Sequence, residues 1–408
     1  MIPMVRKGAV VASASLALCL AAAACSSSSS SSPSGGSSSA SSSSAPAVSI
    51  SVSQFDRNFT AMSALKPLAS AGKGNVAVIL PDTVTSARYV QFDAPYLTQA
   101  LTAAGLSSSQ FTVQNAQGSD QTQLSDAQTA ITKGATVLIM DPLDSGVGAQ
   151  IETYAKAHGV AVIDYDRLTL GGSRQYYVSF NNVLVGTKIG QGFAACATAW
   201  NVSKPNVLVM KGDPTDNNAT LFAQGYLGVL NPFFTSNKYV KVAEPAGTWT
   251  PSVALSEFQQ NFTAHKNINS VLVPNDANAA PIIHYLQTKG VKAKTFPVTG
   301  QDATTIGLQN ILAGYQCGTV YKPIYLEAQA AVALAMFVRA GQKPPTTLVN
   351  ASTNDSKSSA SVPSVYLTPK WVTTQNMNST VVADQFVKAS QLCVGSFAAA
   401  CKSAGISL

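Results

Sequence analysis

The sequence is poor in charge, since only 11% of its 408 residues are Asp, Glu, Lys or Arg. The net charge of +7 is spread along the chain, and basic residues gather no further than pairs such as Arg6-Lys7. A nucleic-acid-binding surface needs a stripe or patch of Lys and Arg. We therefore expect no nucleic-acid partner.

The sequence also lacks the short motifs of zinc, thioredoxin-type and nucleotide sites. None of the six cysteines forms a C-x-x-C pair, and no G-x-x-x-x-G-K stretch is present. The first absence argues against a zinc or redox site, and the second argues against a phosphate-binding loop. We predict no metal and no cofactor.

Long apolar runs are confined to the N-terminus. Arg6 and Lys7 precede "GAVVASASLALCLAAAA" (8–24), which is shorter than a full membrane span, and small residues lead to Cys25. This segment resembles a bacterial lipoprotein signal, although Ala22 stands where that signal usually has Leu. The resemblance implies a signal peptide over 1–24, a lipid on Cys25, and a body held at the outer face of the cell membrane. Plain secretion and an uncleaved anchor are the alternatives.

The residues after Cys25 favour a flexible tether. Residues 26–46 are nearly pure Ser, Gly and Ala, and such a tract cannot bury enough apolar area to offset its chain entropy. We predict a lipidated, Ser-rich tether over 25–73, with the folded body beginning at residue 74.

Four cysteines remain when Cys19 leaves with the signal and Cys25 takes the lipid: Cys196, Cys317, Cys393 and Cys401. An oxidising exterior makes disulfides plausible, and four cysteines allow three pairings. On one continuous helix, Cys393 and Cys401 would lie roughly 12 Å apart, which is too far for a disulfide. Gly395 could break that helix and let them meet, so the pairing stays open.

From residue 75, short apolar runs alternate with amphipathic stretches, a pattern typical of strands and helices in a parallel α/β fold. The first set of predicted strands is 75–80, 111–116, 136–140, 160–166 and 176–180. The second set is 205–210, 239–246, 270–275, 295–300 and 317–321. Two sets of similar size predict two Rossmann-like lobes with a cleft between them.

Polar residues follow the predicted strands, where ligands bind in open parallel sheets. A monosaccharide is a ring of hydroxyl groups with C–H faces, and each buried hydroxyl left without a partner costs about 1–3 kcal/mol. Planar Asp, Asn and Arg side chains can engage two neighbouring hydroxyls, and aromatic rings suit the C–H faces. The strand ends therefore indicate a sugar site.

Six motifs occur in one order along the chain: "YDR" (165–167), "SFNN" (179–182), "GDPTDNNATLF" (212–222), "ND" (275–276), "GQDA" (300–303) and "VYKPI" (320–324). Their order and spacing resemble the xylose-binding proteins of bacterial ABC transporters, which are type I periplasmic binding proteins of the ribose-binding-like kind. The similarity covers about residues 74–375. It implies two lobes joined by a three-segment hinge, with chain crossings near 181–185, 320–324 and 355–365. On this resemblance the first lobe is expected to comprise 74–183 plus 323–354, and the second is expected to comprise 184–322 plus 360–408.

The resemblance also implies a ligand-binding set: Arg88, Tyr89, Asp166, Arg167, Asp216, Asn218, Trp249, Asn275, Asp302 and Lys322. Tyr89 stands where close relatives have Trp, so stacking is kept with a smaller ring. Helix capping is the alternative for Asp216, Asn218, Asn275 and Asp302, and Asn217 is expected to cap a helix or to support the turn. Trp249 could instead lie in the core, and Lys322 could form a surface ion pair.

The resemblance implies a binding protein that captures a monosaccharide, most simply D-xylose, and presents it to membrane permease subunits. We expect a monomer and no enzymatic activity, because Arg167 and the amides would keep Asp166 and Asp216 ionised and leave no catalytic acid. Another pentose or a hexose as ligand, and a sugar sensor feeding a membrane receptor, are the alternatives. A sugar-responsive repressor is disfavoured by the signal and tether at the N-terminus.

Overall fold

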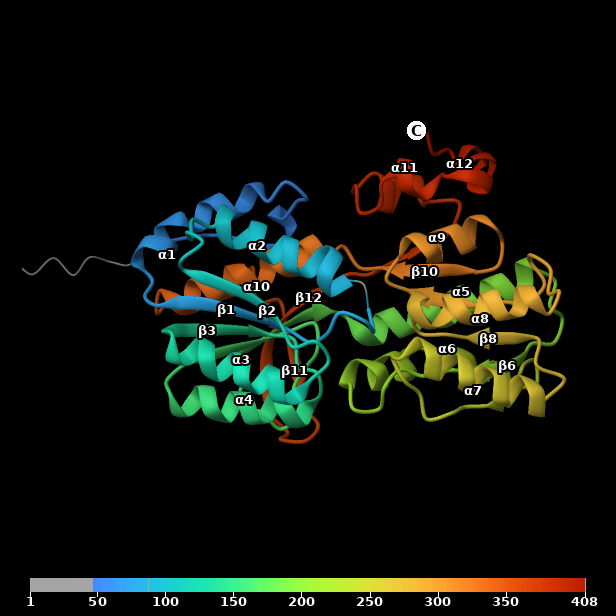
Figure 1. The fold of residues 1–408 in the computed structure, drawn as a ribbon, viewed down its shortest axis with the longest axis horizontal. Helices are drawn as coiled ribbons and strands as arrows, with labels where there is room; N and C mark the ends of the chain where they lie inside the picture. The colour runs from blue at the N-terminus through green and yellow to red at the C-terminus, as the bar shows by residue number, and fades with distance from the viewer. Residues whose placement is uncertain (1–46, 87, 408) are drawn as a thin grey trace, which may run out of the picture. The chain divides into compact units, whose positions relative to one another are not determined.

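The computed structural model describes residues 47–86 and 88–407, and within them a first lobe is built on a seven-stranded sheet (Figure 1). The strand order is β11-β12-β5-β4-β3-β1-β2, and every neighbouring pair is parallel except β11 and β12. The strands are β1 (Asn75–Leu80), β2 (Phe111–Asn115), β3 (Ala135–Met140), β4 (Ala161–Tyr165), β5 (Tyr176–Phe180), β11 (Ala351–Asn354) and β12 (Ser361–Leu367). The predicted parallel α/β class is confirmed.

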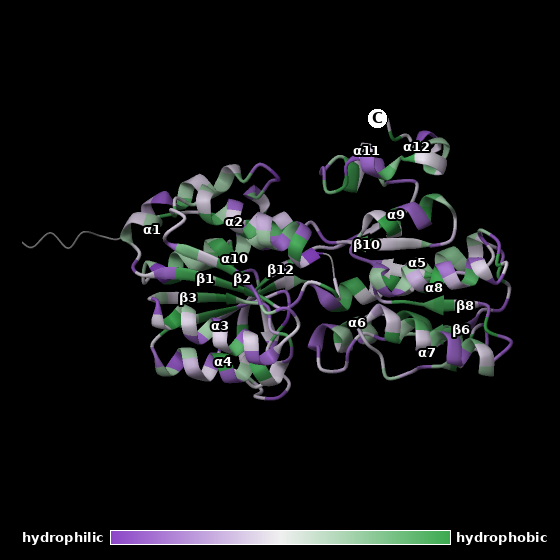
Figure 2. Ribbon diagram, viewed as in Figure 1, coloured by the Kyte–Doolittle hydropathy of each residue, from purple (hydrophilic) through white to green (hydrophobic). Residues whose placement is uncertain are grey.

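Helices cover both faces of this sheet because its strands are apolar on both sides. Val76 and Val78 point into a core shared with α10 (Ile324–Arg339) and α2 (Ala94–Ala103). Ala77 and Ile79 point the other way, into a core shared with α3 (Asp120–Thr132) and α4 (Ser145–Ala157). Figure 2 shows the strands as predominantly hydrophobic between these two layers.

The segment before β1 is folded, so the prediction of a tether reaching residue 73 was wrong. Residues 47–73 contain η1 (Val52–Gln54), η2 (Thr60–Leu65) and α1 (Lys66–Ala71). Buried apolar side chains hold this segment in the first-lobe core: Ile50, Phe55, Phe59, Met62, Leu65 and Leu68. Gln329 Nε2 on α10 donates to the Asp56 carbonyl at 2.8 Å. The predicted signal, Cys25 and residues 26–46 lie outside the described residues.

The second lobe contains two three-stranded sheets, ordered β7-β6-β8 and β13-β10-β9, in the described part of the chain. A single parallel bridge between Val271 and Val298 joins them, and β9 begins only at Thr299, later than predicted. The strands are β6 (Asn206–Val209), β7 (Val240–Ala243), β8 (Ser270–Leu272), β9 (Thr299–Gln301), β10 (Gly318–Tyr321) and β13 (Lys370–Val372). The helices are α5 (Asn182–Ala199), α6 (Asn217–Thr235), α7 (Pro251–Ala264), α8 (Asp276–Thr288) and α9 (Thr305–Leu312).

The chain passes between the sheets at three places, two of them where predicted. It crosses at Asn181, between β5 and α5, and at Lys322-Pro323, between β10 and α10. The third predicted crossing, at 355–365, was wrong, because residues 361–367 form β12 of the first sheet and Leu367 pairs with Phe180. The third crossing therefore lies between β12 and β13, and the second lobe resumes after residue 367.

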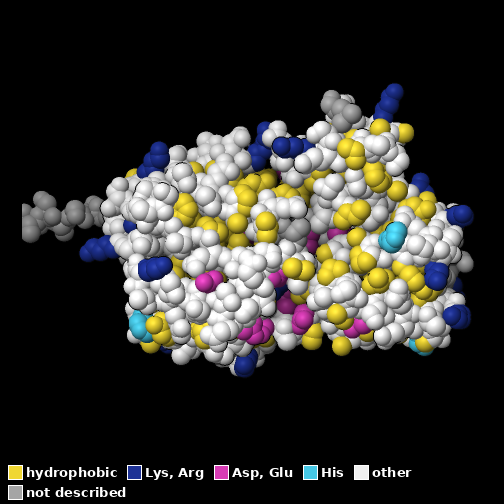
Figure 3. All heavy atoms as spheres, in the orientation of Figure 1, with side chains coloured by type: hydrophobic (Ala, Val, Ile, Leu, Met, Phe, Trp, Pro, Cys, Tyr) yellow, Lys and Arg dark blue, Asp and Glu magenta, His cyan; other side chains and the backbone are white. Residues whose placement is uncertain are grey.

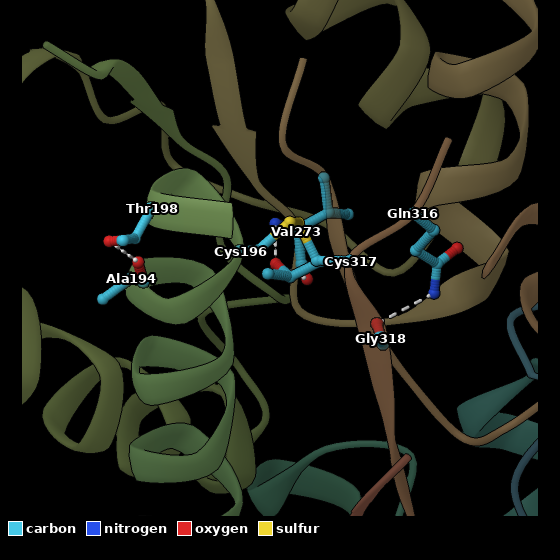
Figure 4. Close-up of a disulfide and its surroundings, with 8 residues drawn as sticks. Ala194, Cys196, Thr198, Val273, Gln316, Cys317 and Gly318 are labelled. Carbon is cyan, nitrogen blue, oxygen red and sulfur yellow. Dashed lines mark hydrogen bonds between the residues drawn. A yellow bond between two sulfur atoms is a disulfide. The ribbon is translucent and has the colours of Figure 1, made fainter. Parts of the chain in front are cut away.

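Two disulfides resolve the open cysteine pairing. Cys196 at the end of α5 is bonded to Cys317 just before β10, which ties two distant segments of the second lobe together (Figure 4). Cys393 is bonded to Cys401. Gly395, with φ of 56°, lies between α11 (Ala389–Leu392) and α12 (Ala398–Ser403) and prevents one continuous helix, as the Cys393–Cys401 disulfide requires. No helix among the described residues has the length and apolarity needed to cross a bilayer.

Candidate sugar-binding site

A polar cavity lies between the ends of strands of both lobes. The empty space between its walls is about 340 Å³, a figure that includes the opening to solvent. It is lined by Thr85, Ser86, Arg88, Tyr89, Asp166, Arg167, Asp216, Asn218, Phe222, Trp249, Asn275, Gln301, Asp302 and Lys322. The structure thus brings all ten predicted ligand-binding residues to one cavity.

Arg88 is held rigidly by three carboxylates. It lies just before the turn η3 (Tyr89–Asp93), which leads into α2. Its Nη1 donates to Asp166 Oδ1 at 2.8 Å, Nε donates to Asp93 Oδ2 at 2.9 Å, and Nη2 donates to Glu327 Oε2 at 2.8 Å. Burial raises the pKa of Glu327 to about 8, although Arg88 acts in the opposite direction. The guanidinium is therefore fixed in place before any ligand arrives.

Asp166 follows β4 in a left-handed backbone conformation, with φ of 58°. Its carbonyl accepts from Ser179 Oγ at 2.8 Å and from Asn218 Nδ2 at 3.0 Å, and the second of these bonds joins the two lobes. Burial alone would raise the pKa of its carboxyl group, but Arg88 and Lys322 outweigh burial and lower it. Asp166 is thus an ionised acceptor at the cavity wall.

Arg167 and Tyr89 form a coupled pair. Arg167 Nη2 donates to the Tyr89 hydroxyl at 3.0 Å, and the guanidinium carbon lies 5.8 Å from the centre of the tyrosine ring. Arg167 Nη1 also donates to the carbonyl of Leu143 at 3.1 Å. A Trp at position 89 has no hydroxyl group to accept this bond, so Tyr89 fixes Arg167 in a way that Trp does not.

Asp216 combines the capping and cavity roles that the sequence left as alternatives. Its Oδ1 accepts from the Asn218 backbone N–H at 2.8 Å, which makes Asp216 the N-cap of α6. Its Oδ2 accepts from Trp249 Nε1 at 2.9 Å. Burial raises the pKa of Asp216 despite the nearby Arg167. Of the two roles expected of Asn217, capping was wrong, because Asn217 is the first residue of the helix itself, and support of the turn stays a prediction.

The indole ring of Trp249 lies against Gly212, where any Cβ atom would collide with the ring. The glycine after β6 therefore leaves room for this aromatic wall. Phe222 stands edge-on to Trp249, with ring centroids 6.3 Å apart. The alternative of a purely core Trp249 does not fit, since the side chain lines the cavity and hydrogen-bonds Asp216.

Two buried acceptors of the cavity wall, Gln301 Oε1 and Asp302 Oδ1, receive no hydrogen bond from the described residues. Lys322 Nζ lies 3.6 Å from Asp302 Oδ1 and 3.7 Å from Asp166 Oδ1, so it spans the two walls. Asn275 lines the cavity and also caps α8, since its Oδ1 accepts from the Asn278 N–H at 2.9 Å. Two unmatched acceptors indicate a ligand that donates hydrogen bonds.

The cations and carboxylates of the cavity wall are balanced. Arg88, Arg167 and Lys322 each lie within 4 Å of a carboxylate oxygen of the wall or just behind it. An anionic ligand would have to compete with these carboxylates for the cations. The electrostatics therefore favour a neutral, polyhydroxylated ligand.

Four lining residues were not predicted: Thr85, Ser86, Phe222 and Gln301. Gln301 and Phe222 lie inside the motifs "GQDA" and "DNNATLF", so their position after a strand or on the capped helix was an available signal. Thr85 and Ser86 carry no such signal. Figure 3 shows Lys and Arg scattered singly over the face it displays, in keeping with the low charge density.

Comparisons with known proteins agree with this geometry. The model of the periplasmic binding protein domain family matches residues 76–343. The D-xylose-binding periplasmic protein of Escherichia coli is 36% identical over 283 residues, covering 69% of this chain and 82% of that protein. The multiple sugar-binding periplasmic receptor ChvE of Rhizobium radiobacter is 30% identical, covering 80% of this chain and 94% of that protein.

Solved structures give the same result. A solute-binding protein from Clostridium phytofermentans with bound β-D-glucose superposes with a TM-score of 0.69 at 26% identity, covering 78% of this chain and 99% of that one. A carbohydrate transporter protein from Chloroflexus aurantiacus with D-glucose gives 0.68 at 27% identity, covering 78% and 97%. These relatives are binding proteins, which confirms the prediction that this chain is not an enzyme. The chain belongs to the type I periplasmic binding protein family, and its similarity to xylose-binding members is the one predicted from its motifs.

Proposed function

We propose that this protein captures a neutral monosaccharide, in the first place D-xylose, and delivers it to the permease of an ABC importer. The observation that carries the proposal is the cavity itself, which combines an aromatic wall at Trp249 with fixed, charge-balanced polar groups. Trp249 suits the C–H face of a pyranose ring. The unmatched acceptors of Gln301 and Asp302 suit sugar hydroxyl groups.

D-Xylose is preferred because two of the relatives that exceed 30% identity are named for binding it. A hexose is the second candidate, because two of the matching structures hold glucose. Tyr89 bears on this choice, since it presents a hydroxyl group and a ring smaller than Trp at the cavity wall.

We also propose that a lipid on Cys25 anchors the protein outside the cell membrane and that residues 26–46 serve as its tether. The support is the apolar segment ending in Ala-Cys and the Ser-rich tract that follows. Residues 47–73 are folded on the first lobe, so the proposed tether does not extend to residue 73 as the sequence alone predicts. Mass spectrometry of the membrane-extracted protein tests the lipid directly.

The proposed ligand is tested by titrating the protein with xylose, ribose, arabinose, glucose and galactose in a calorimeter. We expect saturable binding of at least one sugar, with xylose the tightest. Xylonate serves as a charged control, and we expect it to bind at least about tenfold more weakly than xylose because its carboxylate meets a balanced wall. Failure of every sugar to bind would overturn the proposal.

A further inference from the structure

The C-terminal segment is the feature that the proposed function does not use. Residues 373–407 lie beyond the region matched by the family model, yet they are folded. They follow β13 of the second lobe and contain η4 (Asn378–Val382), α11 and α12, which Figure 1 shows as the red segment near α9. Gln309 Nε2 on α9 donates to the Leu392 carbonyl at 3.2 Å. The segment is therefore anchored on the second lobe.

One aromatic residue of this segment reaches the first lobe. Phe386 is buried and stacks on Phe92, with ring centroids 3.9 Å apart and an interplanar angle of 13°. Phe92 belongs to η3, the turn that begins directly after Arg88 and includes Tyr89. The contact thus joins the second lobe to the turn that contains the cavity residue Tyr89 and directly follows Arg88.

A polar contact lies beside the stack. Asp384 Oδ2 accepts from the Tyr321 hydroxyl at 3.0 Å, at the end of β10 and one residue before Lys322. Burial and then the Asp384 carboxylate raise the pKa of Tyr325 to about 12, and Tyr325 is the second residue of α10 in the first lobe. Tyr325 in turn stands edge-on to Tyr96 on α2, with centroids 6.3 Å apart. The segment 384–386 therefore bridges both sides of the Lys322-Pro323 crossing.

We propose that Phe386 is a positioning residue that holds η3 against the second lobe, stabilises the arrangement in which Arg167 meets Asp216, and so slows release of the sugar. We call this arrangement closed. The inference rests on the proposed function for its ligand, but the Phe92–Phe386 contact exists without one. In this proposal, opening of the lobes separates η3 from the C-terminal segment and breaks the stack, so that only the closed state gains from the contact.

The test uses the full chain and four proteins: wild type, Phe386→Ala, Phe386→Leu and the control Phe397→Ala. Phe397 is a partly buried Phe of the same segment, outside the contact with η3. Sugar dissociation is followed in stopped flow by intrinsic tryptophan fluorescence, to which Trp249 of the cavity wall contributes beside Trp200 and Trp371. We expect Phe386→Ala to raise the dissociation rate about five- to twentyfold with the association rate changed less than about twofold.

Phe386→Leu keeps an apolar side chain in the C-terminal core and removes the ring stack, so it separates loss of the contact from loss of folding. We expect a smaller rise in dissociation rate from it, and no change from Phe397→Ala. Equal dissociation rates in wild type and Phe386→Leu, with unfolding midpoints alike, would overturn the inference.

A second measurement distinguishes failure of this inference from failure of the proposed function. Spin labels at exposed Val84 and Val253, placed as cysteines in a Cys25→Ser background, report the distance between the lobes. In the ligand-free protein we expect a smaller short-distance population in Phe386→Ala than in wild type. If no sugar binds but this difference is seen, only the ligand is wrong; if the distance distributions are identical, the contact does not hold the lobes.

Discussion

Arg167 Nε of the first lobe lies 3.3 Å from Asp216 Oδ2 of the second lobe, and this ion pair crosses the cavity. The same carboxylate caps α6 through its other oxygen and accepts from Trp249 Nε1. One side chain therefore links the first lobe, a helix N-terminus and the aromatic wall. A change in the separation of the lobes must therefore alter the contacts of Asp216. Asp216 thus couples the closure of the lobes to the geometry of the cavity wall.

Asn218 is a further side chain that joins the lobes, and its loss should weaken sugar binding without unfolding the protein. Its Nδ2 donates to the Asp166 carbonyl at 3.0 Å, and its Oδ1 accepts from Asn182 Nδ2 at 2.8 Å. We expect Asn218→Ala to raise the dissociation constant for xylose by about tenfold or more, because a buried hydroxyl group of the sugar and the carbonyl of Asp166 each lose a hydrogen-bond partner.

Calorimetry measures the effect, and Asn217→Ala is the matched control. Asn217 is the neighbouring residue of the same helix turn and does not line the cavity. We expect near wild-type affinity from it. Wild-type affinity in Asn218→Ala would show that the amide is structural and not part of the ligand site.

The strand ends were predictable because apolar runs followed by Asp or Asn are a local pattern. Asp166 after β4 and Asp302 after β9 lie where that pattern places them, and parallel pairing brings them to one edge. A local pattern gives no information on which distant segments pair as strands. The strand β12 contains Pro363 and two Ser residues, and it is a strand because it pairs with β5 on one side and with β11 on the other. Composition also led to a wrong prediction of where the folded body begins. The Ser-rich tract runs almost up to Ile50, which is already buried in the core.

Asp276 is expected to make the stability of the protein depend on pH. It is buried behind Asn275, and burial followed by the charge of Asp302 raises its pKa from 3.8 to about 7. Below about pH 4 the group is protonated in both the folded and the unfolded chain. As the pH rises to about 7, only the unfolded chain ionises, so stability is lost progressively over this interval, by about 4 kcal/mol at most.

Asp276→Asn removes the ionisable group, and we expect its unfolding midpoint to fall less than that of wild type as the pH rises from about 4 to about 8. Gln316 Nε2 donates to Asp276 Oδ1 at 2.7 Å, and its own Oε1 has no partner. The amide of Gln316 can therefore rotate to accept from the new Asn. Thermal unfolding monitored by circular dichroism over this range gives the two profiles. Parallel profiles would show that Asp276 is ionised throughout, held by its donors Thr304, Gln316 and Thr319.

The two disulfides should differ in their contribution to stability because they close loops of different length. Cys196–Cys317 spans 121 residues and Cys393–Cys401 spans 8. In the chain-entropy model the free energy of unfolding gains about 5 kcal/mol from the first and about 2.5 kcal/mol from the second. We expect the Cys196→Ala/Cys317→Ala variant to lose more stability in urea than Cys393→Ala/Cys401→Ala, and each double variant controls for the chemistry of the other. Equal losses, or a larger loss from the short loop, would mean that the C-terminal segment is stabilised by its disulfide through native packing and that chain entropy is not the dominant cause.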